Sequence, residues 1–489
     1  MKTRFCILLV LLLAAIALGC NGKHADAPAA QSVEHAQNII LMIGDGMSVD
    51  VIGLARQYAR SVEARELWME KLMSEGHLAL VDVSPLKKAV TDSAAAATAL
   101  ASGEKTLNGR VSVGPQGQNL TTILELAKRD SRGTGLVTTT RLSHATPACF
   151  AAHLTNRNAE AKIAEQMLAA EIDVLLGGGL AAWIPKGAKA SDFGSLSALA
   201  GADTKSGRND TLNLLEQASR KAYRLITNRE ELLASDGTGK LLGLFAASHL
   251  PYALDRQPED LANVPSLAEM TSAALEYLSQ DNRGFFLMVE GGRIDHAAHN
   301  NDVAAMLAET IDFDEAVGVA LAFAKQHPHT LLLITADHAT GAPALSARYS
   351  DETEKTLYPG DDELKKIGRQ DASFEYMMLA LSKQPSVENL LNLVRSHAGI
   401  EITGEQARFI LDAGPISPFH VIKPRYRKFG YRMLALGQVL GVEYGTTWAT
   451  AEHSAAPVLL ITYGPRAHLM HGYVENTDIF KLMKTAAGL

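Results

Sequence analysis

The stretch Asn38-Ile-Ile-Leu-Met-Ile43, followed at once by Gly44-Asp45-Gly46, decides the fold. A short apolar run without alternating polar residues is typical of a strand that is covered on both faces. Glycine and aspartate directly after such a run favour a turn. We therefore expect a central strand of a buried sheet, with Asp45 at its carboxyl end.

Similar runs recur along the whole chain. They are Leu78–Val83, Gly135–Thr139, Asp173–Leu176, Phe285–Val289, Thr330–Ile334 and Pro457–Thr462. Helical patterns, for example over residues 120–128 and 302–325, separate several of them. This alternation predicts an α/β protein with a large, mostly parallel sheet flanked by helices.

One long segment breaks this rhythm. Residues from about 345 to 444 carry helical patterns at 372–381, 387–396 and 404–411, but no strand of the same kind. We expect an insertion that caps the main sheet. The predicted organisation is a single domain over residues 38–489 with an insertion at about 345–444.

The N-terminus has the pattern of an export signal. Lys2 and Arg4 precede a 14-residue apolar run from Phe5 to Leu18. The run is shorter than the ~20 residues that a membrane-spanning helix needs. Residues 1–20 are therefore a predicted signal peptide, and residues 21–37 a flexible tether.

Ala17-Leu18-Gly19-Cys20 resembles the bacterial lipoprotein box, although that box usually has leucine where Ala17 stands. Lipid attachment at Cys20 is the expected outcome, and loss of Cys20 with the signal is the alternative. The expected location is outside the cytoplasm, in the periplasm or cell envelope.

The composition excludes several classes of protein. With 47% hydrophobic and 20% charged residues over 489 positions, the chain is too apolar for a disordered protein. A net charge of −8 without a long basic run argues against nucleic acid as a partner. If Cys6 and Cys20 belong to the leader, only Cys149 remains and no intramolecular disulfide can form.

Acidic and histidine residues follow the predicted strands, where ligands bind in sheets of this kind. Asp295 and His299 are four residues apart and would share one helical face. Alone, such a pair is more often a surface hydrogen bond than a metal site. The context favours metal, because further ligand types stand at other strand ends, namely Asp45, Glu290, Asp337, His338 and His453. Carboxylates and imidazoles without thiolates suit Zn²⁺ and Mg²⁺.

Two further motifs have two interpretations each. Thr91-Asp92-Ser93, before four alanines, is either an ordinary helix start capped by Asp92 or Ser93, or an exposed serine where the helix N-terminus attracts an anion. Arg157, between two asparagines, is either a surface residue or a clamp that binds a phosphate with two hydrogen bonds. The spacing alone does not choose between them.

Taken together, these motifs resemble the alkaline phosphatases. Seven pieces stand in that family's order, and the set is far more specific than any one of them. The pieces are Gly44-Asp45-Gly46, Thr91-Asp92-Ser93 with its alanines and Thr98, His144-Ala-Thr146-Pro147, Arg157, Glu290 to His299, Thr335-Ala-Asp337-His338, and Glu452-His453. The resemblance covers residues 38–465 except much of the insertion.

The resemblance implies an exported phosphomonoesterase with two zinc ions and one magnesium ion. Ser93 would be the nucleophile that forms a phosphoserine, and Arg157 would bind the non-bridging phosphate oxygens. The implied ligands are Asp295, His299 and His453 for the first zinc, Asp45, Asp337 and His338 for the second, and Asp45, Thr146 and Glu290 for magnesium. Two such cations would stabilise the attacking and leaving oxygens of a displacement at phosphorus.

The sequence departs from the best-known enterobacterial pattern at two positions. His144 and His296 stand where that pattern has Asp and Lys, whereas animal members and several other bacterial ones carry His there. Both imidazoles would lie just outside the metal ligands, and His296 would also line the phosphate pocket. A homodimer is common in the family, but the sequence identifies no interface.

Two other functions compete with this one. A phosphodiesterase or a sulfatase of the same superfamily would use a related site, commonly with threonine or a modified cysteine in place of Ser93. A surface lipoprotein could instead bind phosphate or metal without turnover.

Overall fold

The computed structural model describes residues 35–193, 204–235, 237–256, 263–415, 417–420 and 427–489. The predicted signal peptide, the lipid site Cys20 and most of the predicted tether lie outside the described residues. Residues 34–489 form one compact unit. Ala36 is already buried, and its N–H donates to the carbonyl of Ala486 over 2.8 Å.

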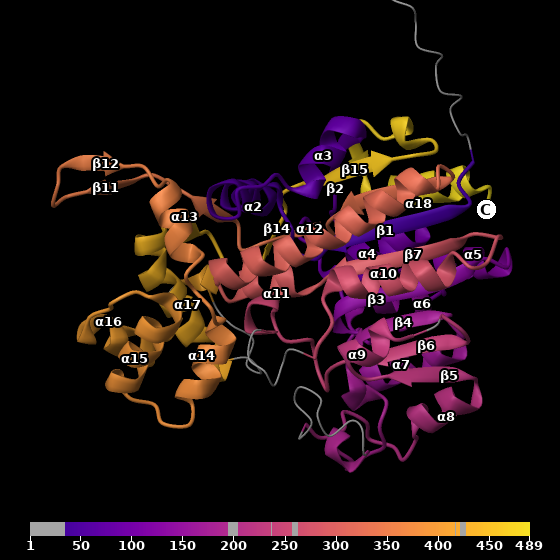
Figure 1. Cartoon of the computed structure of the whole chain (residues 1–489), viewed down its shortest axis with the longest axis horizontal. Coiled ribbons are helices and arrows are strands. Elements are labelled where there is room, and N and C mark those ends of the chain that lie inside the picture. The colour runs from indigo at the N-terminus through magenta and orange to yellow at the C-terminus, as the bar shows by residue number, and fades with distance from the viewer. Residues whose placement is uncertain (1–34, 194–203, 236, 257–262, 416, 421–426) are drawn as a thin grey trace, which may run out of the picture. The chain divides into compact units, whose positions relative to one another are not determined.

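A ten-stranded sheet forms the centre of this unit (Figure 1). Only β15 runs antiparallel to its neighbours, β2 and β8, while the other pairings in the sheet are parallel. The predicted α/β class with a mostly parallel sheet is confirmed. The strands are, in spatial order, β16 (Gly472–Glu475), β2 (His77–Asp82), β15 (Val458–Tyr463), β8 (Thr330–Thr335), β1 (Asn38–Gly44), β7 (Phe285–Gly291), β3 (Gly133–Arg141), β4 (Val174–Gly178), β6 (Lys240–Leu244) and β5 (Tyr223–Ile226).

All seven predicted runs are strands of this sheet, and every residue of β1 is buried. The sequence reading missed β5, β6 and β16, which are four or five residues long. β5 and β16 each include a charged residue, so neither gives a continuous apolar run. β6 has three leucines in five residues and is as apolar as the predicted strands.

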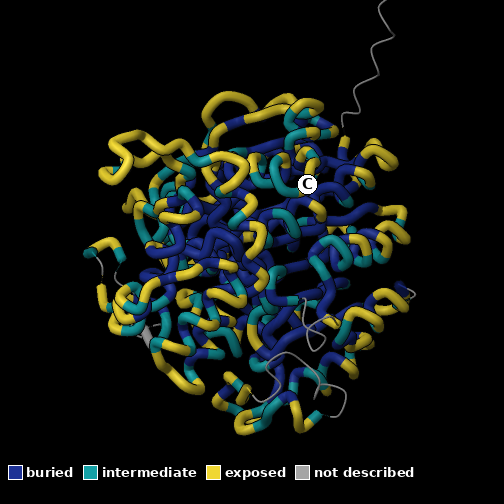
Figure 2. Tube along the Cα trace, turned by 60° about the vertical axis from the view of Figure 1, so that its left-hand side comes forward, coloured by how far each residue is buried: buried dark blue, intermediate teal, exposed yellow. Residues whose placement is uncertain are grey.

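Helices cover both faces of the sheet. Helices α10 and α12 pack on one face, against β7 and its neighbours, while α4, α5, α6 and α18 pack together on the other (Figure 1). The buried part of the trace is concentrated in the interior, with exposed loops around it (Figure 2). The helices outside the insertion are α2 (Val49–Val62), α3 (Trp68–Glu75), α4 (Ser93–Ser102), α5 (Ile123–Arg129), α6 (Ala145–Ala151), α7 (Glu160–Ala169), α8 (Leu214–Arg220), α9 (Arg229–Leu233), α10 (Leu267–Leu278), α11 (Arg293–His299), α12 (Val303–Gln326) and α18 (Asn476–Ala487). Among the described residues, no helix is long and apolar enough to cross a membrane.

In its described residues, the segment predicted as an insertion contributes no strand to the large sheet. It forms a small hairpin and five helices: β11 (Arg348–Ser350), β12 (Lys355–Leu357), α13 (Asp361–Ile367), α14 (Phe374–Leu381), α15 (Val387–Ala398), α16 (Gly404–Leu411) and α17 (Arg427–Tyr444). Two short antiparallel pairs flank it, β10 (Pro343–Leu345) with β13 (Thr446–Trp448), and β9 (Ala339–Thr340) with β14 (His453–Ser454).

Candidate active site

The carboxyl ends of four adjacent strands, β8, β1, β7 and β3, build one face of the site. In the register of the sheet, Ile43 of β1 lies opposite both Glu290 of β7 and the last residue of β8. Asp45 follows β1, and Asp337 and His338 follow β8. Since parallel strands end at the same edge, these carboxylates and the imidazole meet there.

Helix α11 and strand β14 bring three more side chains to this edge. Asp295 and His299 lie on α11, four residues apart as the sequence predicted. Strand β14 pairs His453 with Thr340 of β9, just beyond β8. A contact between residues more than 110 positions apart thus places His453 beside the α11 pair.

The first group consists of Asp295, His299 and His453. The Nδ1 atoms of His299 and His453 lie 2.6 and 2.8 Å from the carbonyl oxygens of Ala451 and Thr91, so each Nδ1 carries a proton and donates it. The Nε2 atoms, only 3.2 Å apart, therefore face each other. Two neutral imidazoles would direct two lone pairs at one point, which needs a shared proton or a cation.

The protonation of the metal-free protein is consistent with that need. Burial lowers the pKa of His453 to about 3 and that of His338 to about 4, so both rings are neutral. Burial also opposes the charged form of His299, but the Asp295 carboxylate, with Nε2 3.3 Å from its Oδ2, raises the pKa of His299 to about 9. One proton therefore occupies the position that a cation would take.

The second group is Asp45, Asp337 and His338, beside Ser93. Thr340 donates its hydroxyl proton to Asp295 over 2.6 Å and accepts from Nδ1 of His338 at 3.2 Å. The Nε2 atom of His338 then lies 3.1 Å from Asp337 Oδ2, 3.6 Å from Asp45 Oδ1 and 3.2 Å from the Ser93 hydroxyl. Neither oxygen of Asp45 has a hydrogen-bond partner among the described residues.

The third group surrounds the other side of Asp45. Asp45, Glu290 and His144 each offer one ligand atom, and these atoms lie within 4.8 Å of one another. Within the described part of the chain, Glu290 Oε1 and the hydroxyl of Thr146 are buried without a partner. Burial raises the pKa of Glu290 to about 7, and burial and neighbouring carboxylates raise that of Asp45. Buried oxygens of this kind are the donors that a hard cation prefers.

The tautomer of His144 follows from Arg157. Nη2 of Arg157 lies 3.2 Å from Nε2 of His144, and a guanidinium can only donate. Nε2 therefore accepts and Nδ1 carries the proton. Because Nδ1 is buried and has no partner among the described residues, His144 presents an unused donor there.

Ser93 and Arg157 are held by one carboxylate. Asp92 is the N-cap of α4, and its Oδ1 accepts from the N–H of Ala95 over 3.0 Å, which leaves Ser93 as the first residue of the helix. The same carboxylate accepts from the N–H of Gly109 and, over 3.0 Å, from Nη1 of Arg157. The arrangement combines a buried serine and a fixed guanidinium at a helix N-terminus, which suits an anion.

His249 is a site residue that the sequence reading missed. It follows β6 in a loop, and its ring lies 4.4 Å from that of His296 and 5.5 Å from that of His144. A lone histidine in an irregular segment gives no signal of its position. His249 also contacts Arg141, Arg157 contacts His144 and Arg293 contacts His296, so three imidazoles and three guanidinium groups line this side of the site.

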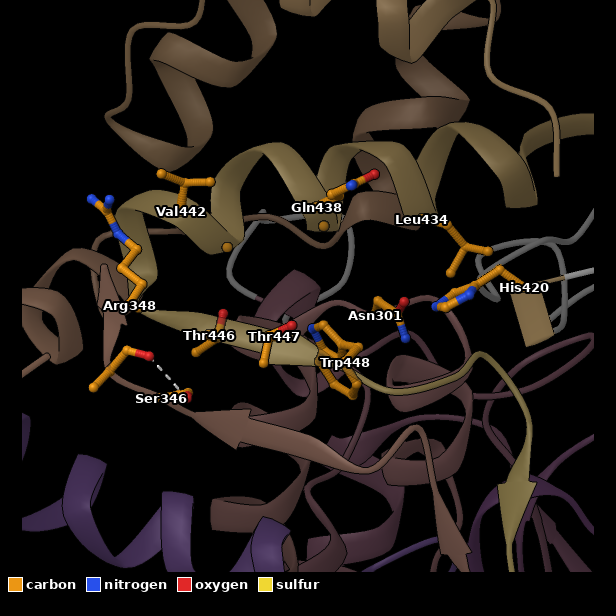
Figure 3. A pocket seen from close by; sticks show the side chains of 14 residues that line it. Asn301, Ser346, Arg348, His420, Leu434, Gln438, Val442, Thr446, Thr447 and Trp448 are labelled. Carbon is orange, nitrogen blue, oxygen red and sulfur yellow. Dashed lines mark hydrogen bonds between the residues drawn. The ribbon is translucent and has the colours of Figure 1, made fainter. Parts of the chain in front are cut away.

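A separate cavity of about 440 Å³ lies between α17 and the β10–β13 pair (Figure 3). Its lining includes Asn301, two residues after His299, and Trp448, five residues before His453. The indole of Trp448 lies against Gly341, where a side chain would come within 2.7 Å of the ring. Trp448 therefore packs against the turn that follows β9 while it lines this cavity.

The fold and the site together define an α/β enzyme equipped to bind cations and an anion beside a serine. The family model described as Alkaline phosphatase matches residues 36–386. The chain is 30% identical over 488 residues to Alkaline phosphatase 4 of Bacillus subtilis, with 97% of this chain and 95% of that protein covered. It is 36% identical to the streptomycin-6-phosphate phosphatase of Streptomyces griseus over 99% of this chain and 96% of that protein.

Solved structures agree with these matches. The alkaline phosphatase of Thermus thermophilus superposes with a TM-score of 0.79 at 32% identity, with 94% of this chain and 93% of that chain covered. The chain therefore belongs to the alkaline phosphatase family and is a phosphoric monoester hydrolase.

Proposed function

We propose that the chain hydrolyses phosphate monoesters through a phosphoserine at Ser93, with Arg157 binding the non-bridging oxygens. The proposed metal set is two zinc ions and one magnesium ion. The ligands would be Asp295, His299 and His453 for the first zinc, Asp45, Asp337 and His338 for the second, and Asp45, Thr146 and Glu290 for magnesium.

One observation carries the metal assignment. The Nε2 atoms of His299 and His453 face each other at 3.2 Å, and both Nδ1 atoms are committed to carbonyl oxygens. A borderline cation bound by nitrogen and carboxylate donors resolves this contact, and zinc is such a cation. The unpartnered oxygens of Asp45, Thr146 and Glu290 suit magnesium, which prefers oxygen donors.

His144 supports the choice of magnesium for the third group. Its Nδ1 carries a proton, so this atom would donate to an oxygen, such as a water on the ion, and would not bind the ion itself. His144 would then orient the magnesium site from outside, as the family resemblance implies. In this position His144 would keep its hydrogen bond with Arg157, which uses the other ring nitrogen.

The residues of the chain divide the reaction between them. When bound, the cations lower the pKa of the serine hydroxyl and stabilise the charge on the leaving oxygen. The Ser93 oxygen forms a bond to phosphorus as the ester P–O bond breaks. The serine proton passes to solvent, and the leaving alkoxide takes a proton from solvent and departs as the alcohol. Arg157, fixed by Asp92, would bind two non-bridging phosphate oxygens and so orient the ester with its leaving oxygen in line with the attacking Ser93 oxygen. A water then attacks the phosphoserine, which releases inorganic phosphate and restores Ser93.

Parallel assays on a phosphate monoester, a phosphate diester and a sulfate ester test this function. We expect the monoester to be hydrolysed fastest in the presence of Zn²⁺ and Mg²⁺, and turnover to vanish in Ser93→Ala. The matched control Ser102→Ala changes the last residue of the same helix. Faster turnover of the diester would favour the phosphodiesterase, and full activity after chelation would exclude the metal assignment.

We also propose that the protein is exported and lipid-anchored at Cys20, which rests on the sequence of residues 1–20 alone. In a bacterial host, the full-length chain should fractionate with membranes and incorporate labelled fatty acid. Cys20→Ser should abolish the label. An unlabelled protein in the cytoplasm would contradict both parts of this proposal.

A further inference from the structure

We propose that Arg293 is a positioning residue for His296 and that Glu375 of the insertion holds Arg293 in place. The chain of contacts runs from α14 of the insertion to the first turn of α11, and from there to the imidazole in the phosphate pocket. This inference rests on the proposed place of His296 in that pocket. It gives the insertion a role in substrate binding.

Arg293 is the first residue of α11 and is 5% exposed. Its guanidinium lies over the ring of Tyr252, 3.7 Å from the ring centre. One end, Nη2, lies 3.1 Å from Oε2 of Glu375, and the other, Nη1, lies 3.2 Å from Nδ1 of His296. The planar group therefore bridges two side chains that are 79 positions apart in the sequence.

The bridge fixes the tautomer of His296. A guanidinium has only donors, so Nδ1 of His296 has to accept, and the proton of the neutral ring stands on Nε2. Among the described residues Nε2 has no hydrogen-bond partner. It remains as a donor for an oxygen of the phosphate group. The opposite tautomer would direct a lone pair at that oxygen and repel it.

Glu375 is itself held in position by buried contacts of its helix. Ser373, the N-cap of α14, donates its N–H and its hydroxyl to Asp255, both over 2.7 Å. The N–H of Phe374 donates to Asp302 over 2.6 Å. Two buried carboxylates of the main domain thus anchor the start of α14, and Glu375 follows directly.

The rings around His296 restrict its remaining freedom. His249 meets it edge-on at 4.4 Å and His144 at 5.5 Å between ring centres. A tilt of the His296 ring out of its plane would bring it against these rings, and a flip within the plane would replace the Nδ1 acceptor by a C–H group and lose the bond with Arg293. The direction of the Nε2–H bond is therefore set by Arg293 together with two imidazoles.

Nitrogen-15 spectra of histidine-labelled protein without metal test the tautomer directly. We expect the proton of His296 on Nε2 in the unmodified protein. In Arg293→Met, which keeps an unbranched chain over Tyr252, both tautomers should be populated. A proton on Nδ1 of His296 in the unmodified protein would overturn the proposal.

Kinetics of the metal-loaded enzyme test the consequence for phosphate. Arg293→Met should raise KM for a phosphate monoester and Ki for inorganic phosphate about tenfold, the effect of one hydrogen bond to a charged group, with a much smaller change in kcat. Arg293→Lys keeps a donor and should recover part of the loss. Glu375→Gln should raise both constants about threefold, because this pair is partly exposed.

The Glu375→Gln variant distinguishes a loss of positioning from a loss of folding. The side chain of Glu375 is 54% exposed, so the substitution should leave the melting temperature unchanged. Glu388→Gln, an exposed acid in the first turn of α15, is the matched control and should change neither constant. In a His296→Ala background, Glu375→Gln should change KM and Ki no further, because Glu375 and Arg293 act on phosphate only through the His296 ring. Additive effects, or equal constants in all variants, would overturn the proposal. Failure of the unmodified protein to hydrolyse any monoester would instead refute the proposed function.

Discussion

The protonation of His299 leads to a prediction about the metal-free protein. The pKa of this histidine is about 9 in the folded chain, above the ordinary value of 6.5, because the Asp295 carboxylate outweighs the cost of burial. A group with a raised folded pKa stabilises the fold below its unfolded pKa. That contribution is lost as the pH rises through the folded pKa. The metal-free protein should therefore lose stability between pH 7 and pH 10.

The size of the loss follows from the shift. A displacement from 6.5 to about 9 corresponds to about 3 kcal/mol. The side chain is 27% exposed, so this figure is an upper value. With an unfolding entropy of about 2.1 cal/mol/K per residue, about 450 residues convert it to a decrease of about 3 °C in melting temperature.

Differential scanning fluorimetry of chelator-treated protein at several pH values measures this decrease. His299→Gln removes the titrating group. Between pH 7 and pH 10, the melting temperature of metal-free His299→Gln should therefore fall by about 3 °C less than that of the metal-free original chain. His471→Gln, at an exposed position, is the control and should behave like the original. If the melting temperature fell equally with pH in the original chain and in His299→Gln, the proton assigned to His299 in the metal-free protein would be refuted.

Three further perturbations test separate parts of the structure. Arg157→Lys replaces the planar guanidinium by a single ammonium group, which cannot bind two phosphate oxygens in parallel. It should lower kcat/KM about 10- to 100-fold, as measured by steady-state kinetics, while Asp92 still pairs with the lysine. Gly46→Ala would place a Cβ 2.9 Å from the Cα of Asp295 at a φ of +71°, so bound zinc, measured by elemental analysis, should fall. Asp314→Ala removes the acceptor of two N–H groups at the start of α3 and should cost about 3 kcal/mol of stability in a denaturant titration, with KM unchanged.

Local patterns in the sequence were sufficient for much of the fold. Continuous apolar runs predicted seven strands and the α/β class, because a strand buried on both faces has to be apolar throughout. Since parallel strands end at one edge, the residues after these runs could be expected to meet. Asp45, Asp337 and His338 do meet there, with Asp45 Oδ1 3.6 Å from His338 Nε2.

Contacts between distant residues decided what the sequence could not. The antiparallel direction of β15, the pairing of His453 with Thr340, and the place of His249 depend on how loops return to the sheet, and no local pattern encodes that return. The contact of Arg293 with Glu375 likewise requires α14 to be docked on the main domain.

The tautomers of the histidines are also decided by the tertiary structure and not by the sequence. The sequence determined that imidazoles and carboxylates stand at the strand ends, which is enough to indicate the chemistry. Which ring nitrogen carries the proton depends on the group that faces it, a carbonyl oxygen for His299 and His453 or a guanidinium for His144 and His296. A hydrogen bond forms only when donor and acceptor lie within about 3 Å of each other, and only the folded chain brings these groups that close.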